Sequence, residues 1–288
     1  MLVHGGAWGI PDEEVQAHTD GVRVAIERAR QMLEAGRPAL DVVEEVVASL
    51  ESDPAFNAGR GGVLDRDGLV QLDAGIMNGP TLAWGAVAGL RATPNPVRVA
   101  RLLVGGDGRA RLLVGEGAER FAAEHGLPHV EPSRLIVPRE VERRAVAEAP
   151  QGTVGCVALD QAGSLAVASS TGGTPGAIPG RVGDTPLVGS GFYADGSAAV
   201  CATGWGEPLA TVQIASRVAS QVDLDVRPDD AAAQALDAMR RCVGWADGGA
   251  TGGLLVLGAD GAGGWAFTTP RMARGGWASG SAIWTAVD

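Results

Sequence analysis

The chain has 288 residues, of which 45% are apolar and 20% are charged, and its formal net charge is −11. This length suits one large α/β unit, and the ordinary composition argues against a disordered or collagen-like protein. The acidic balance disfavours nucleic-acid binding, which needs a basic surface, and the apolar stretches are far shorter than the roughly 20 residues of a membrane helix.

The first half is predicted to begin with two helices. Apolar residues recur at helical spacing from Val22 to Leu33, and a second amphipathic pattern places Leu40 and Leu50 on one face. The elements expected next are strands at 69–77 and 84–90, a helix at 96–104, a strand at 111–114 and a helix to about 125. Residues 127–152, rich in proline and in charge of both signs, are the best linker candidate.

The second half is predicted to open with a hairpin, because two buried strand patterns at 153–160 and 165–171 flank the turn sequence DQAGS. Helices are expected at 207–222 and 229–243, and strands at 252–258 and 264–269 are expected to close the chain. We expect one domain, residues 1–288, of the α/β class. Two strand-rich halves that each carry helices fit a four-layer α/β/β/α sandwich, although periodicity alone does not separate this from other α/β layerings.

Lysine is absent, because all 23 residues counted as Lys or Arg are arginines. This excludes P-loop phosphate binding, pyridoxal Schiff bases and Ser-x-x-Lys hydrolases, each of which needs a lysine amine. Cys156, Cys201 and Cys242 lack metal-ligand spacing, so they are expected to be buried thiols of a reducing compartment. The opening residues MLVHGGAWGI lack the pattern of a secretory signal, and we expect a cytoplasmic protein.

Five short motifs follow one another along the chain: HGG, FNAG, the central stretch GTVGCVALDQAGSLAVASSTGG, GRVGD and ATGWG. In this order they resemble the plant-type asparaginase / isoaspartyl peptidase family of N-terminal-nucleophile hydrolases. The resemblance implies a threonine-dependent amidohydrolase that cleaves the side-chain amide of L-asparagine or β-aspartyl dipeptides. It also implies autoproteolysis at Gly152-Thr153, which would leave an α subunit of residues 1–152, with its linker at about 127–152, and a β subunit of residues 153–288.

The cleavage would serve the chemistry of Thr153. A threonine hydroxyl is a poor nucleophile unless a base lies beside it, and the α-amine of an N-terminal threonine can be that base. Cutting the bond between Gly152 and Thr153 would create this amine. By the resemblance, Thr171 would hydrogen-bond the nucleophile and Asn57 would position it.

Two later motifs would bind the substrate. By the resemblance, Thr203 and Gly204 form the oxyanion hole, where fixed donors stabilise the charge that develops on the attacked carbonyl, and Gly206 also binds substrate. Arg181 and Asp184 match the residues that hold the α-carboxylate and α-amino group of an aspartyl-type substrate. These residue types suit the task, since a guanidinium binds a carboxylate at two points and a carboxylate accepts from an ammonium.

The loop LESDPAFNAGRG resembles the family's sodium-binding loop. Carbonyl oxygens suit a hard cation. The backbone carbonyls implied as ligands of a structural sodium ion are those of Leu50, Glu51, Asp53, Phe56, Ala58 and Arg60. An ordinary turn held by Pro54 and Gly59 is the alternative. No cofactor is expected for catalysis, and the resemblance implies a homodimer of processed protomers.

Two tryptophans depart from the family's pattern. Trp8 and Trp205 stand where smaller residues are usual, and we expect them to reshape the pocket, with Trp205 restricting the leaving-group side. One alternative function is a glycosylasparaginase, although that group usually carries TNG where this chain has TGG at 171–173. A second alternative is an unprocessed relative that acts as a binding or scaffold protein.

Overall fold

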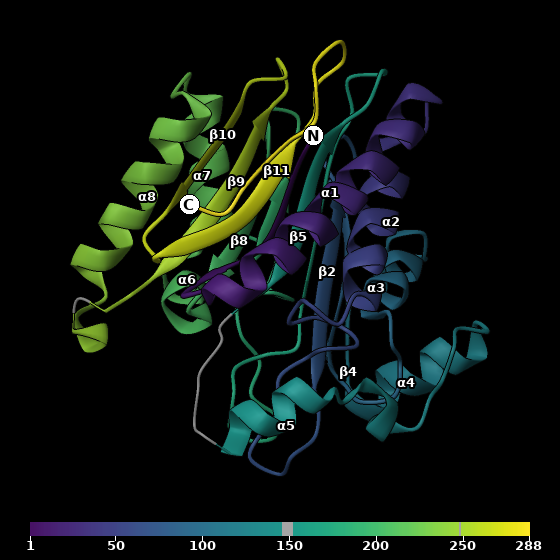
Figure 1. Cartoon of the computed structure of the whole chain (residues 1–288). Helices are drawn as coiled ribbons and strands as arrows, with labels where there is room; N and C mark the ends of the chain where they lie inside the picture. Colours follow the sequence, from purple (N-terminus) through teal and green to yellow (C-terminus); the bar gives the residue numbers. More distant parts are fainter. Residues whose placement is uncertain (146–151, 248) are drawn as a thin grey trace.

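A computed structural model describes residues 1–145, 152–247 and 249–288 of the chain, which form a mixed α/β structure with two β-sheets (Figure 1). The strands of the larger sheet, in spatial order, are β12 (Trp284–Ala286), β11 (Arg271–Gly276), β1 (Leu2–Trp8), β5 (Val154–Leu159), β6 (Leu165–Thr171), β2 (Leu72–Asn78), β3 (Ala83–Leu90) and β4 (Leu112–Val114). The strands of the smaller sheet are β10 (Gly263–Phe267), β9 (Gly252–Gly258), β8 (Ala198–Gly204) and β7 (Phe192–Ala194).

Eight α-helices lie within the described ranges. They are α1 (Asp12–Glu34), α2 (Ala39–Ser52), α3 (Pro96–Val104), α4 (Gly115–Glu124), α5 (Pro138–Ala145), α6 (Gly206–Val212), α7 (Ile214–Asp223) and α8 (Pro228–Cys242). There are also two short 3-10 helices, Pro132–Leu135 between α4 and α5, and Gly244–Ala246 between α8 and β9. No helix in the described part of the chain is long and apolar enough to cross a membrane.

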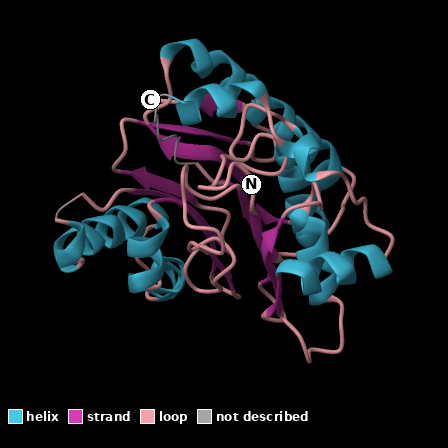
Figure 2. Ribbon diagram, turned by 90° about the horizontal axis from the view of Figure 1, so that it is seen from below, coloured by secondary structure: helices cyan, strands magenta, loops and turns pink. Residues whose placement is uncertain are grey.

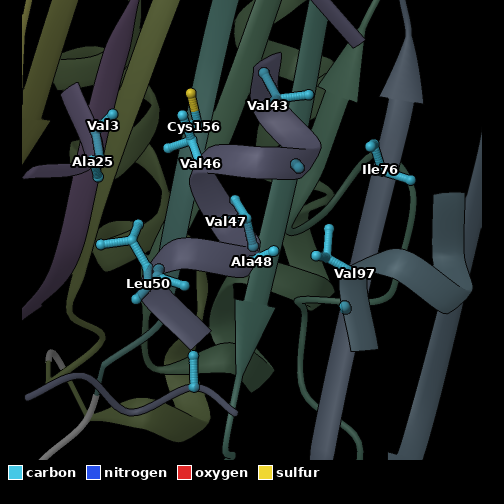
Figure 3. Close-up of a cluster of buried hydrophobic side chains, with 14 of the residues drawn as sticks. Val3, Ala25, Val43, Val46, Val47, Ala48, Leu50, Ile76, Val97 and Cys156 are labelled. Atoms are coloured by element: carbon cyan, nitrogen blue, oxygen red, sulfur yellow. The ribbon is translucent and has the colours of Figure 1, made fainter. Parts of the chain in front are cut away.

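The outer face of the larger sheet is covered by α1, α2 and α3, whose apolar stripes pack onto it. Val46, Val47 and Leu50 of α2 belong to one buried cluster with Cys156 of β5, and Figure 3 shows Val46 beside Cys156. Because side chains alternate along a strand, every second residue of β5 reaches this helical layer, and the residues between them point to the opposite face. Val157 accordingly belongs to a different buried cluster.

That second cluster lies between the two sheets. It includes Val157 and Val167 from the larger sheet and Phe192, Ala199 and Leu255 from the smaller one. The far face of the smaller sheet packs against α7 and α8 in a third cluster. The sheets therefore lie face to face with helices on both outer sides. Figure 2 shows the strands in magenta between two groups of helices in cyan.

Most predicted elements are confirmed, including the hairpin of β5 and β6 with its turn at residues 160–164. The single helix expected at 207–222 is wrong, because Gln213 adopts a left-handed conformation (φ 51°) and divides it into α6 and α7. The expectation that two strands close the chain is also wrong, since β11 and β12 follow. Short strands rich in Arg and Gly do not give a clear alternating pattern.

One further expectation needs correction: Cys156 and Cys201 are buried, but Cys242 is exposed at the end of α8.

The linker expected at 127–152 stays a prediction. This segment contains a 3-10 helix and α5, in which Leu135 and Arg143 are buried. Residues 146–151 of the segment lie outside the described residues.

Candidate active site

Strand pairing sets the neighbours of Thr153, which directly precedes β5 and is 4% exposed. The antiparallel register pairs Val154 with Ser170. Continued by one residue, the same register places Thr153 opposite Thr171. Both threonines follow the alternation that points Val157 and Val167 between the sheets, so their side chains face the smaller sheet.

The carbonyl group that joins Gly152 to Thr153 accepts two hydrogen bonds. Nδ2 of Asn57 donates to it at 2.8 Å, and the hydroxyl of Thr171 donates at 3.1 Å. Asn57 is itself fixed, because its Oδ1 accepts from the backbone N–H of Val63 at 3.0 Å. Two oriented donors therefore polarise the carbonyl beside Thr153.

The HGG motif supplies the backbone that lies against this peptide. Gly6 has φ +105°, and a Cβ atom added to it would stand 3.0 Å from the Cα of Gly152. The pairing of β1 with β11 shifts between His4 and Ala7, which marks an irregularity at these glycines. A glycine is needed here both for the left-handed backbone and for the close approach.

Thr203 and Gly204 end β8 on the facing sheet. Thr203 is fully buried, and its hydroxyl accepts from the backbone N–H of Ala7 at 3.4 Å. Gly204 has φ +126°, and a Cβ there would lie 2.6 Å from the Cα of Gly252. This backbone conformation requires glycine. Gly204 and Thr153 line the same cavity.

A small cavity of about 10 Å³ is lined by seven of the predicted site residues. Its walls include Gly152, Thr153, Thr171, Arg181, Asp184, Gly204 and Gly206. The absence of a side chain on Gly206 allows Arg181 and Asp184 to approach it. A Cβ atom on Gly206 would lie 2.9 Å from both Nη2 of Arg181 and Oδ1 of Asp184. Of the remaining predicted site residues, Asn57 reaches the cavity through Gly152, whereas Thr203 is not part of its wall.

Asp184 is a buried carboxyl group with an open hydrogen-bonding position. It is 3% exposed, and its Oδ2 has no hydrogen-bond partner among the residues that the structure describes. Burial raises the pKa of Asp184 to about 7, although the nearby Arg181 works in the opposite direction. A cationic group entering the cavity would favour the ionised carboxylate.

Arg181 is held by a residue that lies outside the five motifs. Its Nε and Nη2 donate to the two carboxylate oxygens of Glu207 at 2.8 and 2.9 Å. Burial works against the charge of Arg181, but the hydrogen bonds of Glu207 together with the attraction of Glu207, Asp184 and Asp73 outweigh it and raise the pKa of Arg181. The same contact lowers the pKa of Glu207. The position of Glu207, directly after ATGWG, was the available signal.

Asp73 was also missed. It is 2% exposed on β2, pairs in register with Thr171 and accepts from the N–H of Gly89 at 2.9 Å. Burial raises the pKa of Asp73 to about 7, and the attraction of Arg181 opposes this. An acidic residue among the apolar residues that open the strand LDAGIMN was the signal, since a buried carboxyl group needs a polar partner.

At the end of α2 and in the loop after it, two carbonyl oxygens lie close to glycines of the loop. The Glu51 carbonyl accepts from the N–H of Arg60 at 2.8 Å, and Gly59 approaches the same oxygen too closely for a side chain. A Cβ on Gly61 would lie 2.7 Å from the carbonyl oxygen of Phe56. Each carbonyl oxygen has a second lone pair, so these groups fit a hard cation. The sodium site remains a prediction.

The two unusual tryptophans lie in different surroundings. Trp8 lines a second small cavity together with Asn57 and Gly152. Trp205 packs edge-on against Trp245, with ring centroids 5.6 Å apart, and is not part of the wall of the first cavity. Trp205 therefore does not contact the first cavity directly, and its expected effect on the leaving group stays a prediction.

The sequence of the chain was compared with known protein families and with curated proteins. The family model described as "Asparaginase" matches residues 1–145 and 139–287. The isoaspartyl peptidase/L-asparaginase of Rattus norvegicus is 39% identical over 300 residues, covering 100% of this chain and 85% of the rat protein. The isoaspartyl peptidase of Escherichia coli is 41% identical over 246 residues, covering 77% and 76% of the two chains. The chain belongs to the asparaginase family of these proteins.

Proposed function

We propose that this member of the asparaginase family hydrolyses the side-chain amide of L-asparagine and the isopeptide bond of β-aspartyl dipeptides, with Thr153 as nucleophile. The observation that carries the proposal is the pair of hydrogen bonds from Asn57 and Thr171 to the Gly152 carbonyl, beside the Thr153 hydroxyl. The names of the rat and bacterial relatives support the same reaction.

The first step is cleavage of the chain itself. The hydroxyl of Thr153 attacks the Gly152 carbonyl carbon, and the charge on its oxygen is stabilised by the donors of Asn57 and Thr171. The acyl group moves from the nitrogen of Thr153 to its oxygen, and water then hydrolyses the ester. One water is consumed, the Gly152 carboxylate is released and the α-amine of Thr153 is freed.

The freed amine is the base for the second reaction. Before cleavage this nitrogen is an amide and cannot accept a proton at neutral pH, whereas an α-amine has a reference pKa near 7.7 to 8.0. It takes the proton of the Thr153 hydroxyl, which attacks the side-chain carbonyl of the substrate. Ammonia or an amino acid leaves, and water hydrolyses the β-aspartyl ester to aspartate. Thr203 and Gly204 are proposed as the groups that stabilise the charge on the attacked oxygen.

The charges in the cavity favour an aspartyl-type substrate. The unpartnered Oδ2 of Asp184 can accept from the substrate's α-ammonium, which would stabilise the ionised carboxylate. Arg181 lines the same cavity and can donate to the α-carboxylate. A compound with both groups on one carbon, as in asparagine, would place its side chain toward Thr153.

The family also supports finer structural proposals. We propose that the two sheets with helices on both outer sides form the four-layer α/β/β/α sandwich of N-terminal-nucleophile hydrolases. Residues 1–152 and 153–288 would remain packed together after cleavage, because β5 lies in the middle of the larger sheet. A homodimer of cleaved protomers and a sodium ion in the loop at 50–60 complete the proposal.

The direct test is to incubate the purified protein with L-asparagine, a β-aspartyl dipeptide and a glycosylated asparagine. Release of aspartate from the first two, absent in Thr153→Ala, is the expected result. Faster cleavage of the glycosylated compound would favour a glycosylasparaginase. An uncut protein that is inactive on all three would favour a binding or scaffold role.

A further inference from the structure

Gly152 separates two small cavities, and this arrangement points to a site for the group that leaves the substrate. The first cavity holds Thr153 and the aspartyl-binding residues, and the second lies beyond Gly152. We propose that the second cavity becomes the subsite for the amino acid released from a β-aspartyl dipeptide, with Trp8 as its wall and Arg139 as the anchor for its carboxylate. This inference rests on the proposed function.

The direction of departure follows from what surrounds Thr153. Arg181 and Asp184, proposed to hold the aspartyl group, and Gly204, proposed for the oxyanion, line the first cavity and not the second. Gly152 is the residue in this wall that cleavage detaches from Thr153. Each cavity holds only about 10 Å³ in the uncut chain, so the subsite requires that release of Gly152 opens the space between them.

Trp8 is a firmly held wall. The guanidinium of Arg143 lies 5.3 Å from the centroid of its ring, and the ring of His18 lies 6.0 Å away. Arg143 is itself fixed, since its side chain is 9% exposed and pairs with Glu140 at 2.8 Å and with Glu14. A large flat ring in a fixed position suits contact with the side chain of a leaving amino acid.

Arg139 has a donor left for a ligand. Its Nε donates to Glu140 at 2.8 Å and its Nη1 to the carbonyl of Ala55 at 3.3 Å, while Nη2 contacts no acceptor among the described residues. Its side chain is 28% exposed, so it remains accessible from solvent. Figure 1 places α5, which carries Arg139, at the same end of the sheets as α6.

The charges around the second cavity are balanced, so a carboxylate would be bound there by an open donor and not by excess positive charge. Its ionisable wall residues are Arg139, Arg143, Glu140 and His18. Burial lowers the pKa of His18, which favours the neutral ring at neutral pH. Glu14, outside this wall, also pairs with Arg143, so two carboxylates balance the two guanidinium groups and the open Nη2 of Arg139 is the donor that a carboxylate would use. The leaving amino acid of a dipeptide carries a free carboxylate, whereas the ammonia released from asparagine has none.

The test compares β-aspartyl-leucine with its C-terminal amide, which lacks the carboxylate, in cleaved protein verified by intact mass. We expect kcat/KM of the wild type to be about 10-fold or more higher for the free acid, the usual effect of a hydrogen bond to a charged group. Arg139→Gln should abolish this preference and lower the dipeptide-to-asparagine ratio about 10-fold. Arg120→Gln, an exposed arginine on α4 that lines neither cavity, should keep both ratios.

Equal kcat/KM for the free acid and the amide in the wild type would overturn the subsite. This comparison needs no variant, so it decides the matter even if Arg139→Gln fails to fold or to cleave. An unchanged ratio in cleaved Arg139→Gln would equally contradict it. A wild-type protein that hydrolyses none of the three compounds would instead refute the proposed function, and the subsite with it.

Discussion

Arg181 and Glu207 form a two-point ion pair, in which Nε and Nη2 of the arginine lie 2.8 and 2.9 Å from the two carboxylate oxygens. One edge of the guanidinium is therefore already occupied before any substrate arrives. A substrate carboxylate must use the remaining Nη1 side. Because the side chain of Glu207 is 43% exposed, the pair serves to orient Arg181 more than to stabilise the fold.

The first prediction concerns Arg181. Arg181→Ala should lower kcat/KM for L-asparagine by on the order of 10²-fold, because it removes a charge-assisted contact with the α-carboxylate. Arg181→Lys should recover only part of the activity, since an ammonium lacks the planar fork of donors. Arg217→Ala, on the exposed face of α7, is the control. Near wild-type kinetics in Arg181→Ala would remove Arg181 from the binding site.

The second prediction is a pH dependence of substrate binding. Burial raises the pKa of Asp184 to about 7, so below this pH the group is protonated and cannot pair with the substrate's ammonium. KM for L-asparagine should therefore fall as the pH rises through about 7. Asp184→Asn should show a higher KM that no longer varies in this range. A wild-type KM that is constant from about pH 6 to 8 would contradict the assignment.

The third prediction concerns the two donors on the Gly152 carbonyl. Asn57→Ala and Thr171→Val should each slow self-cleavage by about 10²- to 10³-fold, the usual effect of losing one donor to a developing oxyanion. Thr171→Ser keeps the hydroxyl and should cleave much faster than Thr171→Val. Intact mass over time after purification gives the rates. Cleavage of Asn57→Ala at the wild-type rate would show that this donor has no part in the reaction.

The fourth prediction concerns the loop at 50–60. If its carbonyl groups hold sodium, Tm should be higher in sodium chloride than in tetramethylammonium chloride of equal ionic strength. The reason is that an ion bound only by the native state stabilises the native state. The effect should grow with sodium concentration. Identical Tm values in the two salts would leave the loop as an ordinary turn.

The sequence predicted the core elements well because their patterns are local. The apolar stripe of α2 and the hairpin of β5 and β6 can be identified from neighbouring residues alone. The break at Gln213 could not, since nothing in its residue type demands a left-handed backbone. The edge strand β12 pairs with β11, and such short pairings depend on tertiary contacts more than on the three residues involved.

The motifs select residues that the structure brings together, whereas contacts between distant residues leave no local signal in the sequence. Thr153, Thr171 and Asp184 were selected from their motifs, and the structure brings them to one cavity. The contact of Trp8 with Arg143 joins residues 135 positions apart, so no local pattern indicates it. The burial that raises the pKa of Asp73 likewise arises only when the sheets pack together.

The central claim is that Thr153 becomes an N-terminal nucleophile through cleavage of its own chain. The most direct measurement follows intact mass and asparaginase activity together in purified wild type and in Thr153→Ala. We predict that the wild type yields the fragments 1–152 and 153–288, that activity rises in proportion to the cut fraction, and that Thr153→Ala stays whole and inactive. A full-length wild-type chain that hydrolyses asparagine would contradict this account, because its Thr153 nitrogen would still be an amide.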